Sequence, residues 1–252
     1  MNNFDLLATH YWYPLYPHLA HSHFRLNSET IINTWIMLGI GFLLLLPVRR
    51  LLRKKDGIAR YLAISFVSSF VDLTKQTLGT LHRRHFYFIT ALFCFIFLCN
   101  LASIIPWVEE PTSDLNTTLA LGIISFMYIQ YYAIKKNGVK EYLKSYLSPF
   151  FIMLPLNIIG KLASIGSMSF RLFGNIFGGS IISKIWTKVI SGSVLWESVG
   201  ILSGMNLLIT GFFGLFEGFL QAFVFAMLTV TYLSIAIQDE GEDEEVYEGA
   251  TL

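Results

Sequence analysis

The chain is dominated by apolar stretches that are long enough to cross a lipid bilayer. The hydrocarbon core of a bilayer is about 30 Å thick, so a helix needs about 20 apolar residues to cross it. Five stretches approach or exceed this length: residues 31–48, 86–105, 117–134, 149–190 and 199–237. Because lipid offers the backbone no hydrogen-bond partners, such stretches fold as helices. The sequence therefore predicts an all-α polytopic membrane protein with about five spans.

The composition also fits a protein with much of its surface in lipid. Hydrophobic residues make up 54% of the chain and charged residues 14%, whereas soluble domains contain about 25% charged residues. The formal net charge is only +1, and we predict no nucleic-acid partner. Continuous helices over 149–190 and 199–237 would exceed the bilayer thickness, so we expect them to tilt or bend.

The charged residues of the loops predict which side of the membrane each loop faces. Nine Lys and Arg residues lie between residues 49 and 85, and four lysines follow the third span at 135–144. The loop between the second and third spans carries acids instead, at 109–114. Because basic loops stay on the cytoplasmic side, the N-terminus is predicted outside and the C-terminus inside.

The chain is predicted to form a single membrane domain with three peripheral parts. Residues 1–30 form an outer arm, whose four histidines match no metal-ligand spacing and favour a solvated arm over a metal site. The segment 61–85 begins with an amphipathic stretch too polar to span, so we expect it at the cytoplasmic membrane surface. Residues 238–252 form an acidic tail on the cytoplasmic side.

One arginine lies inside the fourth apolar stretch, where a charge is costly. Arg171 belongs to the segment MSFRLFGNIFGG, and the only other charged residue within 149–183 is Lys161. An arginine at mid-bilayer costs about 2.5–3.5 kcal/mol on insertion scales, and its guanidinium does not escape this cost by losing a proton. Such a residue normally faces a polar cavity or a partner carboxylate, so Arg171 is a predicted functional residue.

The helix side that carries Arg171 is predicted to be small and polar. At helical spacing it comprises Ser164, Ser167, Gly174, Asn175 and Gly178. Small residues allow another helix to approach closely. Packing between two helices of this chain would explain the glycines, but it would leave the arginine unexplained.

The last apolar stretch carries a second polar group of residues. Glu217 and Gln221 are four residues apart, so they share one face of a helix. Glu217 is the only carboxylate between Glu197 and Asp239. Such a group either takes up and releases protons along an ion path or forms a structural ion pair.

A fixed cation on one helix and a titratable acid on another are typical of a path for ions. Two aqueous paths that each reach half way through the membrane, separated by the arginine, would let ions cross. A stand-alone secondary transporter would have a similar composition, but it predicts repeated halves with broken helices, which the sequence does not show. A structural membrane scaffold would leave Arg171 without a role. No Gly-rich loop ending in Lys-Ser or Lys-Thr indicates a nucleotide site, and we predict no cofactor and no metal.

Four segments give the chain a specific family resemblance. They are NLASIIPW (100–107), PTSDLNTTLAL (111–121), SFRLFGNIFGG (169–179) and LQAFVFAMLTVTYLS (220–234). With these segments the chain resembles subunit a of F-type ATP synthases, the stator half of the membrane motor. The resemblance covers about 100–234, and it implies that 149–237 forms a long helical hairpin facing the rotating c-ring.

The resemblance also implies roles for individual residues. Arg171 corresponds to the arginine that faces the ion-carrying carboxylates of the c-ring. Asn175 and Gln221 correspond to polar neighbours of that arginine, and Asp114 and Asn116 fall in the loop near the outer half-channel. The arginine would favour the ionised form of a passing carboxylate and block a direct proton leak.

One departure from the family pattern concerns the proton relay. Many members carry Glu at the position of Ser180, and others carry an acid or His at the position of Gly214. Glu217 lies about one helical turn from Gly214, closer to Gln221. We therefore expect Glu217 to act as the outer-channel relay in this chain.

The expected function is proton translocation coupled to c-ring rotation and ATP synthesis. A Na⁺-coupled version of the same motor is the alternative within the family. The resemblance implies a non-catalytic subunit whose partners are the c-ring, the subunit b peripheral stalk and membrane lipids. It also implies a place in the bacterial inner membrane or in an organellar energy-transducing membrane.

Overall fold

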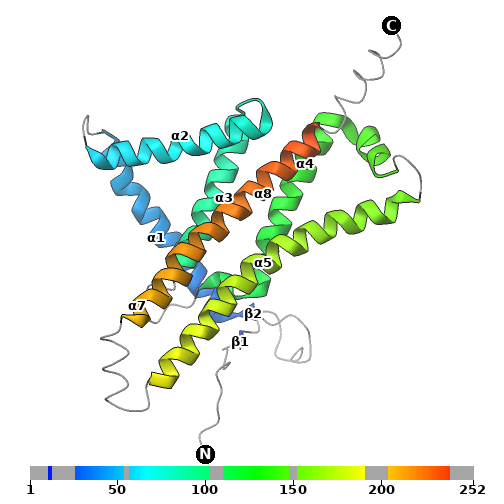
Figure 1. Ribbon diagram of the computed structural model, residues 1–252. Helices are drawn as coiled ribbons and strands as arrows, with labels where there is room; N and C mark the ends of the chain where they lie inside the picture. Colours follow the sequence, from blue (N-terminus) through cyan, green and yellow to red (C-terminus); the bar gives the residue numbers. More distant parts are fainter. Residues whose placement is uncertain are drawn as a thin grey trace, which may run out of the picture.

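The described part of the chain is almost entirely helical in its computed structural model (Figure 1). The structure describes residues 11–12, 26–53, 57–102, 110–147, 152–190 and 204–238. Its helices are, in chain order, α1 (Ser28–Arg53), α2 (Ile58–Leu78), α3 (Arg83–Leu101), the 3-10 helix η3 (Pro111–Ser113), α4 (Leu115–Leu147), α5 (Met153–Ile190), α7 (Met205–Thr210), the π-helix η4 (Gly211–Glu217) and α8 (Gly218–Gln238). Two short strands, β1 (Tyr11–Trp12) and β2 (Leu26–Asn27), pair antiparallel.

Several of these helices are suited to a membrane. Among the described residues, four helical segments are long and apolar enough to span: Thr30–Pro47, Arg83–Leu101, Leu115–Lys144 and Gly211–Ile237. The prediction of an all-helical membrane protein is thereby confirmed. Helix α5, within the predicted span at 149–190, is the longest helix but is not in this group. Its apolar residues are interrupted by four Lys and Arg residues, at 161, 171, 184 and 188.

Helix α2 lies across one end of the bundle (Figure 1). It is not among the segments apolar enough to span. The helix ends at Gly79, whose φ of 71° lies in the left-handed region that favours glycine. The predicted interfacial segment 61–85 therefore comprises most of α2, a turn and the first residues of α3. Its place at the membrane surface stays a prediction.

Helix α4 is broken near its C-terminal end. Gly138 has a φ of 81° and a ψ of 159°, which no helical residue adopts. The chain bends at this point, so the last turns of α4 leave the direction of its apolar part (Figure 1). The apolar part ahead of the break contains the predicted span 117–134.

The core is formed by helices that are distant in sequence. Helix α8 packs mainly against α3 and α4, whereas α5 packs mainly against α4. Ile89 and Ile96 of α3, Leu172 of α5, and Phe225 and Val230 of α8 are almost fully buried. This packing fixes α5 and α8 relative to each other, and these helices carry the polar residues singled out in the sequence.

Two predicted parts of the chain lie outside the described residues. The four histidines of the N-terminal arm are at positions 10, 18, 21 and 23, and the acidic tail follows residue 238. The predictions made for them therefore stay predictions.

Candidate functional site

A single asparagine side chain joins the two helices that carry the predicted site. Asn175 of α5 donates from Nδ2 to Glu217 Oε1 at 2.8 Å and to Gln221 Oε1 at 2.9 Å. An asparagine amide has two N–H donors, so one proton is available for each acceptor. Glu217 and Gln221 thus share one face, as their spacing predicts, and this face is turned towards α5.

The backbone just before this pair is unusual. Residues Gly211–Glu217 form a π-helix, in which hydrogen bonds reach one residue further along the chain than in an α-helix. Glu217 is its last residue and is partly buried, and Gln221 lies in α8 and is only 4% exposed. Short π-helical segments frequently occur at functional sites.

A second asparagine holds the junction between the π-helix and α8. Asn100 near the end of α3 donates from Nδ2 to the carbonyl of Gly218 at 2.9 Å. Its Oδ1 accepts a hydrogen bond from Thr112 Oγ1 at 2.7 Å. Asn100 and Thr112 are completely buried, and a hydrogen bond of this kind contributes about 0.5–1.5 kcal/mol to stability.

The close contact between Asn100 of α3 and the start of α8 leaves room only for glycine at position 218. A Cβ atom built on Gly218 would lie 2.9 Å from Cβ of Asn100, closer than side chains tolerate. A second close approach occurs between α5 and the π-helix, where a Cβ on Gly179 would lie 2.8 Å from the ring of Phe213. The two glycines therefore let three elements converge on Glu217.

Arg171 lies one helical turn before Asn175, but it is exposed on the surface of the chain. Ser167 and Gly174 beside it are also exposed, and a Cβ on Gly174 would meet no atom within 4 Å. Within the described part of the chain, Arg171 makes no hydrogen bond or ion pair. Its guanidinium therefore faces away from the helices that pack around α5.

The small polar face predicted around Arg171 is divided between two environments. Ser167 and Gly174 are exposed, whereas Ser164, Asn175 and Gly178 are partly covered. Asn175 is turned towards α8, as its hydrogen bonds show. The reason is that residues four apart on a helix point about 40° apart. This rotation is enough to place Arg171 on the exposed side of α5 and Asn175 on the side that α8 covers.

The structural alternative for Glu217 was an ion pair. No ion pair joins Glu217 to Arg171 among the residues that the structure describes. The carboxylate instead accepts a hydrogen bond from a neutral amide. This arrangement leaves the second carboxylate oxygen available to exchange a proton with another group or with water.

The remaining predicted site residues are not hydrogen-bonded to this cluster. Asp114 precedes α4 and accepts the backbone N–H of Asn116 at 2.9 Å and the hydroxyl of Thr30 at 3.2 Å, so it caps a helix and contacts α1. Asn116 is exposed. Ser180 donates to the carbonyl of Phe177 in its own helix at 2.9 Å.

A cavity of about 260 Å³ lies between α4, α5 and α8 on the side of Arg171 away from Glu217 along α5. Polar groups of Gln130, Lys161 and Ser164 line it. So does Ser125, whose buried hydroxyl has no hydrogen-bond partner in the structure. A cavity of this size with several polar groups can hold water.

Sequence reasoning missed Asn100 as a site residue. A signal was present, because Asn100 is a polar amide at the end of an otherwise apolar span. Its partner Gly218 lies 118 residues further along the chain, and no local pattern connects the two. Among the described residues, no group of three or more His, Cys, Asp or Glu side chains could hold a metal ion.

Comparisons with known proteins match most of this sequence. The family model described as ATP synthase A chain matches residues 31–234. The chain is 32% identical to ATP synthase subunit a of Moorella thermoacetica, over 82% of this chain and 89% of the relative. It is 34% identical to ATP synthase subunit a 2 of Acaryochloris marina, over 85% and 87% of the two chains. It is 33% identical to ATP synthase subunit a of Aliarcobacter butzleri, over 82% and 88%.

Proposed function

Because the chain belongs to the ATP synthase A chain family, we propose that it translocates protons through two half-channels at the interface with a rotating c-ring. Movement of protons along their gradient would thereby be coupled to ATP synthesis. The observation that carries this proposal is the open face of α5, where Arg171 is exposed next to the Asn175–Glu217–Gln221 cluster.

The exposed arginine calls for a partner outside this chain. A guanidinium in an apolar surrounding is costly unless an opposite charge or water compensates it, and the described part of the chain supplies no ion pair. A carboxylate on a neighbouring c-ring helix would provide the compensation. The exposed Gly174, with open space around it, lets such a helix approach closely.

The cluster next to the arginine suits a proton relay. Glu217 is the one member with a carboxyl group, and Asn175 holds its position through a hydrogen bond to Oε1. Gln221 is fixed by the same amide. In this proposal Glu217 delivers protons from the outer side, and the cavity lined by Gln130 and Ser164 forms part of the inner path.

The proposed role involves no bond chemistry in this chain. The chain would be the non-catalytic stator that holds the ion path, in contact with the c-ring and with the subunit b peripheral stalk. Its place would be the bacterial plasma membrane, with the N-terminus outside and the C-terminus in the cytoplasm.

The experiment that tests the proposal replaces the arginine. Arg171→Ala should reduce ATP-driven pH-gradient formation in inverted vesicles by about a hundredfold or more, because a fixed charge next to the moving carboxylates is lost. Arg171→Lys should restore little, since a point charge does not match a planar guanidinium. Lys188→Ala, which removes an exposed cation from the same helix, is the matched control and should pump normally.

Pumping is measured in Na⁺-free buffer and divided by the amount of assembled complex. Normal pumping by Arg171→Ala would refute the proposal. Pumping by the unmodified chain that requires added Na⁺ would instead identify the sodium-coupled version of the motor.

A further inference from the structure

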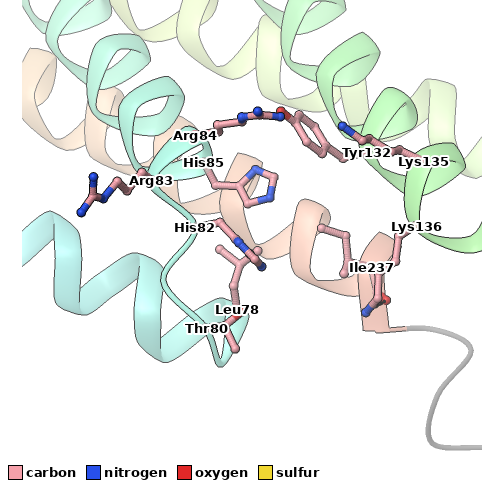
Figure 2. Close-up of a pocket in the computed structure, with 10 residues that line it drawn as sticks. All are labelled: Leu78, Thr80, His82, Arg83, Arg84, His85, Tyr132, Lys135, Lys136 and Ile237. Carbon is pink, nitrogen blue, oxygen red and sulfur yellow. Dashed lines mark hydrogen bonds between the residues drawn. The ribbon is translucent and has the colours of Figure 1, made fainter.

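A second cavity lies at the end of the bundle where α2 crosses it. Its volume is about 600 Å³, and it is bounded by the end of α2, the start of α3, α4 and the end of α8. Figure 2 shows the side chains around it: those of Arg84, Tyr132 and Lys135 lie on one side, and that of Lys136 lies next to Ile237. This cavity is distinct from the site around Arg171 and is lined by different residues.

The lining of this cavity is strongly basic. It contains Arg83, Arg84, Lys135 and Lys136, together with His82 and His85, and no acidic residue from the described part of the chain. The four Arg and Lys residues are exposed, and the side chains of Arg84, Lys135 and Lys136 lie around the cavity, whereas that of Arg83 points away from them (Figure 2). We refer to this cavity, with its four cations and two histidines, as the basic pocket.

Contacts within the chain hold two of the lysines over the cavity. Lys136 Nζ donates to the carbonyl of Ile237 at 2.9 Å, which satisfies one backbone acceptor at the end of α8. Lys135 Nζ lies 5.9 Å from the ring centre of Tyr131 and 6.0 Å from that of Tyr132. An ammonium group has three donors, so Lys136 keeps N–H groups for a ligand.

The basic pocket also has an apolar part and lies at the predicted membrane boundary. Leu78, Tyr132 and Ile237 contribute to its lining. Leu78 ends the amphipathic helix α2, and Ile237 ends the apolar segment of the last helix. A ligand in this position would therefore meet positive charges on one side and apolar side chains on the other.

We propose that the basic pocket binds the phosphate-containing headgroup of an anionic phospholipid. Clusters of Lys and Arg next to membrane helices attract anionic lipids, and basic pockets between such helices bind their headgroups. The lipid phosphate would contact Arg84, Lys135 and Lys136, and the upper part of the acyl chains would contact Leu78 and Ile237. This binding would not depend on the proton path around Arg171.

A lipid matches the pocket better than the acidic segment that follows α8 in sequence. The first seven residues of that segment, Asp-Glu-Gly-Glu-Asp-Glu-Glu, match the charge of the pocket but supply no apolar group for Leu78 and Ile237, because the first apolar side chains of the segment are Val246 and Tyr247. A phospholipid supplies both. The acidic segment is therefore the competitor that an experiment has to separate from the lipid.

The test uses the complete, detergent-solubilised ATP synthase complex containing this chain. The probe is a phosphatidylglycerol with a photoactivatable group in its acyl chain. It is mixed at increasing fractions into micelles of detergent and phosphatidylcholine. After illumination, mass spectrometry measures the yield of lipid attached to peptides covering residues 78–85, 132–136 and 237. We expect a saturable yield, with little change when inorganic phosphate is added at the lipid's concentration.

The pocket variant is Arg84→Gln combined with Lys135→Gln. Each cation near an anionic lipid contributes about fivefold in affinity, so the variant should need about thirtyfold more phosphatidylglycerol for half-saturation. The matched control is Lys140→Gln combined with Lys144→Gln, two exposed lysines of α4 outside the pocket lining. This control should bind as the unmodified chain does, and the amount of assembled complex is measured for each variant.

Four results would overturn the proposal. The first is equal half-saturation in the pocket variant and the unmodified chain, and the second is an equal loss in the control, which would indicate general surface charge. The third is labelling that appears only after the acids of residues 239–248 are changed to Gln or Asn. That result would show that the acidic segment, and not lipid, occupies the pocket. Complete displacement by inorganic phosphate would likewise assign the pocket to free phosphate.

Discussion

The two sides of α5 differ in whether contacts within this chain account for their residues. On the packed side, Leu172 and Ile176 are buried against other helices, and Gly179 has no space for a side chain next to Phe213. On the open side, Arg171 has no partner among the described residues, and Gly174 has free space around it. The same helix therefore contains glycines that this fold requires and glycines that it does not.

This difference separates stability from interaction. A glycine that another part of the same chain touches contributes to folding, and replacing it should lower stability. A glycine that faces open space next to a charged residue has no such role in the isolated chain. Its small size becomes useful only when a further helix packs there, which is the c-ring in the proposed function.

The largest effect is expected at Glu217 of the π-helix, which is hydrogen-bonded to Asn175 at the border between the two sides of α5. Glu217→Gln should slow pumping per assembled complex by about a hundredfold, because a relay must bind and release a proton. Glu217→Asp should retain part of the activity. Measurement of ATP-driven pH gradients and of complex content in the same vesicles gives the required ratio.

The control for this prediction removes an acid elsewhere. Asp72→Asn changes an exposed carboxylate of α2 far from the cluster in sequence and should leave pumping unchanged. The double variant Ser180→Glu with Glu217→Gln should recover some transport if both positions face one water-filled path. An unchanged ratio in Glu217→Gln would mean that this carboxylate is structural.

A smaller effect is expected from filling the open side. Gly174→Leu should reduce pumping by about tenfold or more, since displacing the partner helix by about 1 Å misaligns the reacting groups. Gly39→Leu is the matched control, because Gly39 on α1 is also exposed and also has no atom within 4 Å of an added Cβ. Equal losses in both variants would break the distinction between the open face of α5 and ordinary lipid-facing surface.

On the packed side, the expected effect is on stability and not on transport. Gly179→Ala should destabilise the protein by about 1–3 kcal/mol, because the methyl group would overlap the Phe213 ring. Gly174→Ala makes the same chemical change in open space, so it should be neutral or stabilise by up to about 1 kcal/mol. Thermal unfolding of the two purified variant subunits, measured without the c-ring, gives the difference, and equal unfolding temperatures would contradict the packing argument.

The smallest effect on activity is expected from a labelling experiment. It determines on which side of the membrane the C-terminal tail lies, and thereby which aqueous side each end of α5 faces. A cysteine introduced at Glu244, in a chain with Cys94 and Cys99 changed to Ala, should react with a membrane-impermeant maleimide only from the cytoplasmic side. The physical reason is the positive charge of the loops at 49–85 and 135–144. Labelling from outside in sealed cells would reverse the predicted orientation, while activity should be unaffected.

The membrane helices could be predicted because their signal is local and strong. Four of the five predicted stretches overlap a described helix that is long and apolar enough to cross the bilayer. The shared face of Glu217 and Gln221 also follows from helical spacing, and their common donor Asn175 shows it directly. The prediction for Arg171 is local as well, because a charge inside an apolar stretch is costly wherever the neighbouring helices lie.

The features that escaped prediction depend on contacts between distant segments. The residues from Phe212 to Phe216 are apolar except for Gly214, so no periodic pattern distinguishes a π-helix from an α-helix there. Asn100 is connected to Gly218 only by tertiary packing. The separation of Arg171 from Asn175 into two environments likewise depends on where α8 lies.

The π-helix also has a consequence for how the chain tolerates changes in length. Each of its backbone bonds spans five residues instead of four, so Gly211–Glu217 accommodates extra chain without lengthening the helix in proportion. The contacts of α8 with α3 are anchored immediately after it by the bond from Asn100 to Gly218. An insertion or deletion ahead of residue 211 would therefore have to change the π-helix before it moved Gln221, because the bond from Asn100 holds Gly218 in place.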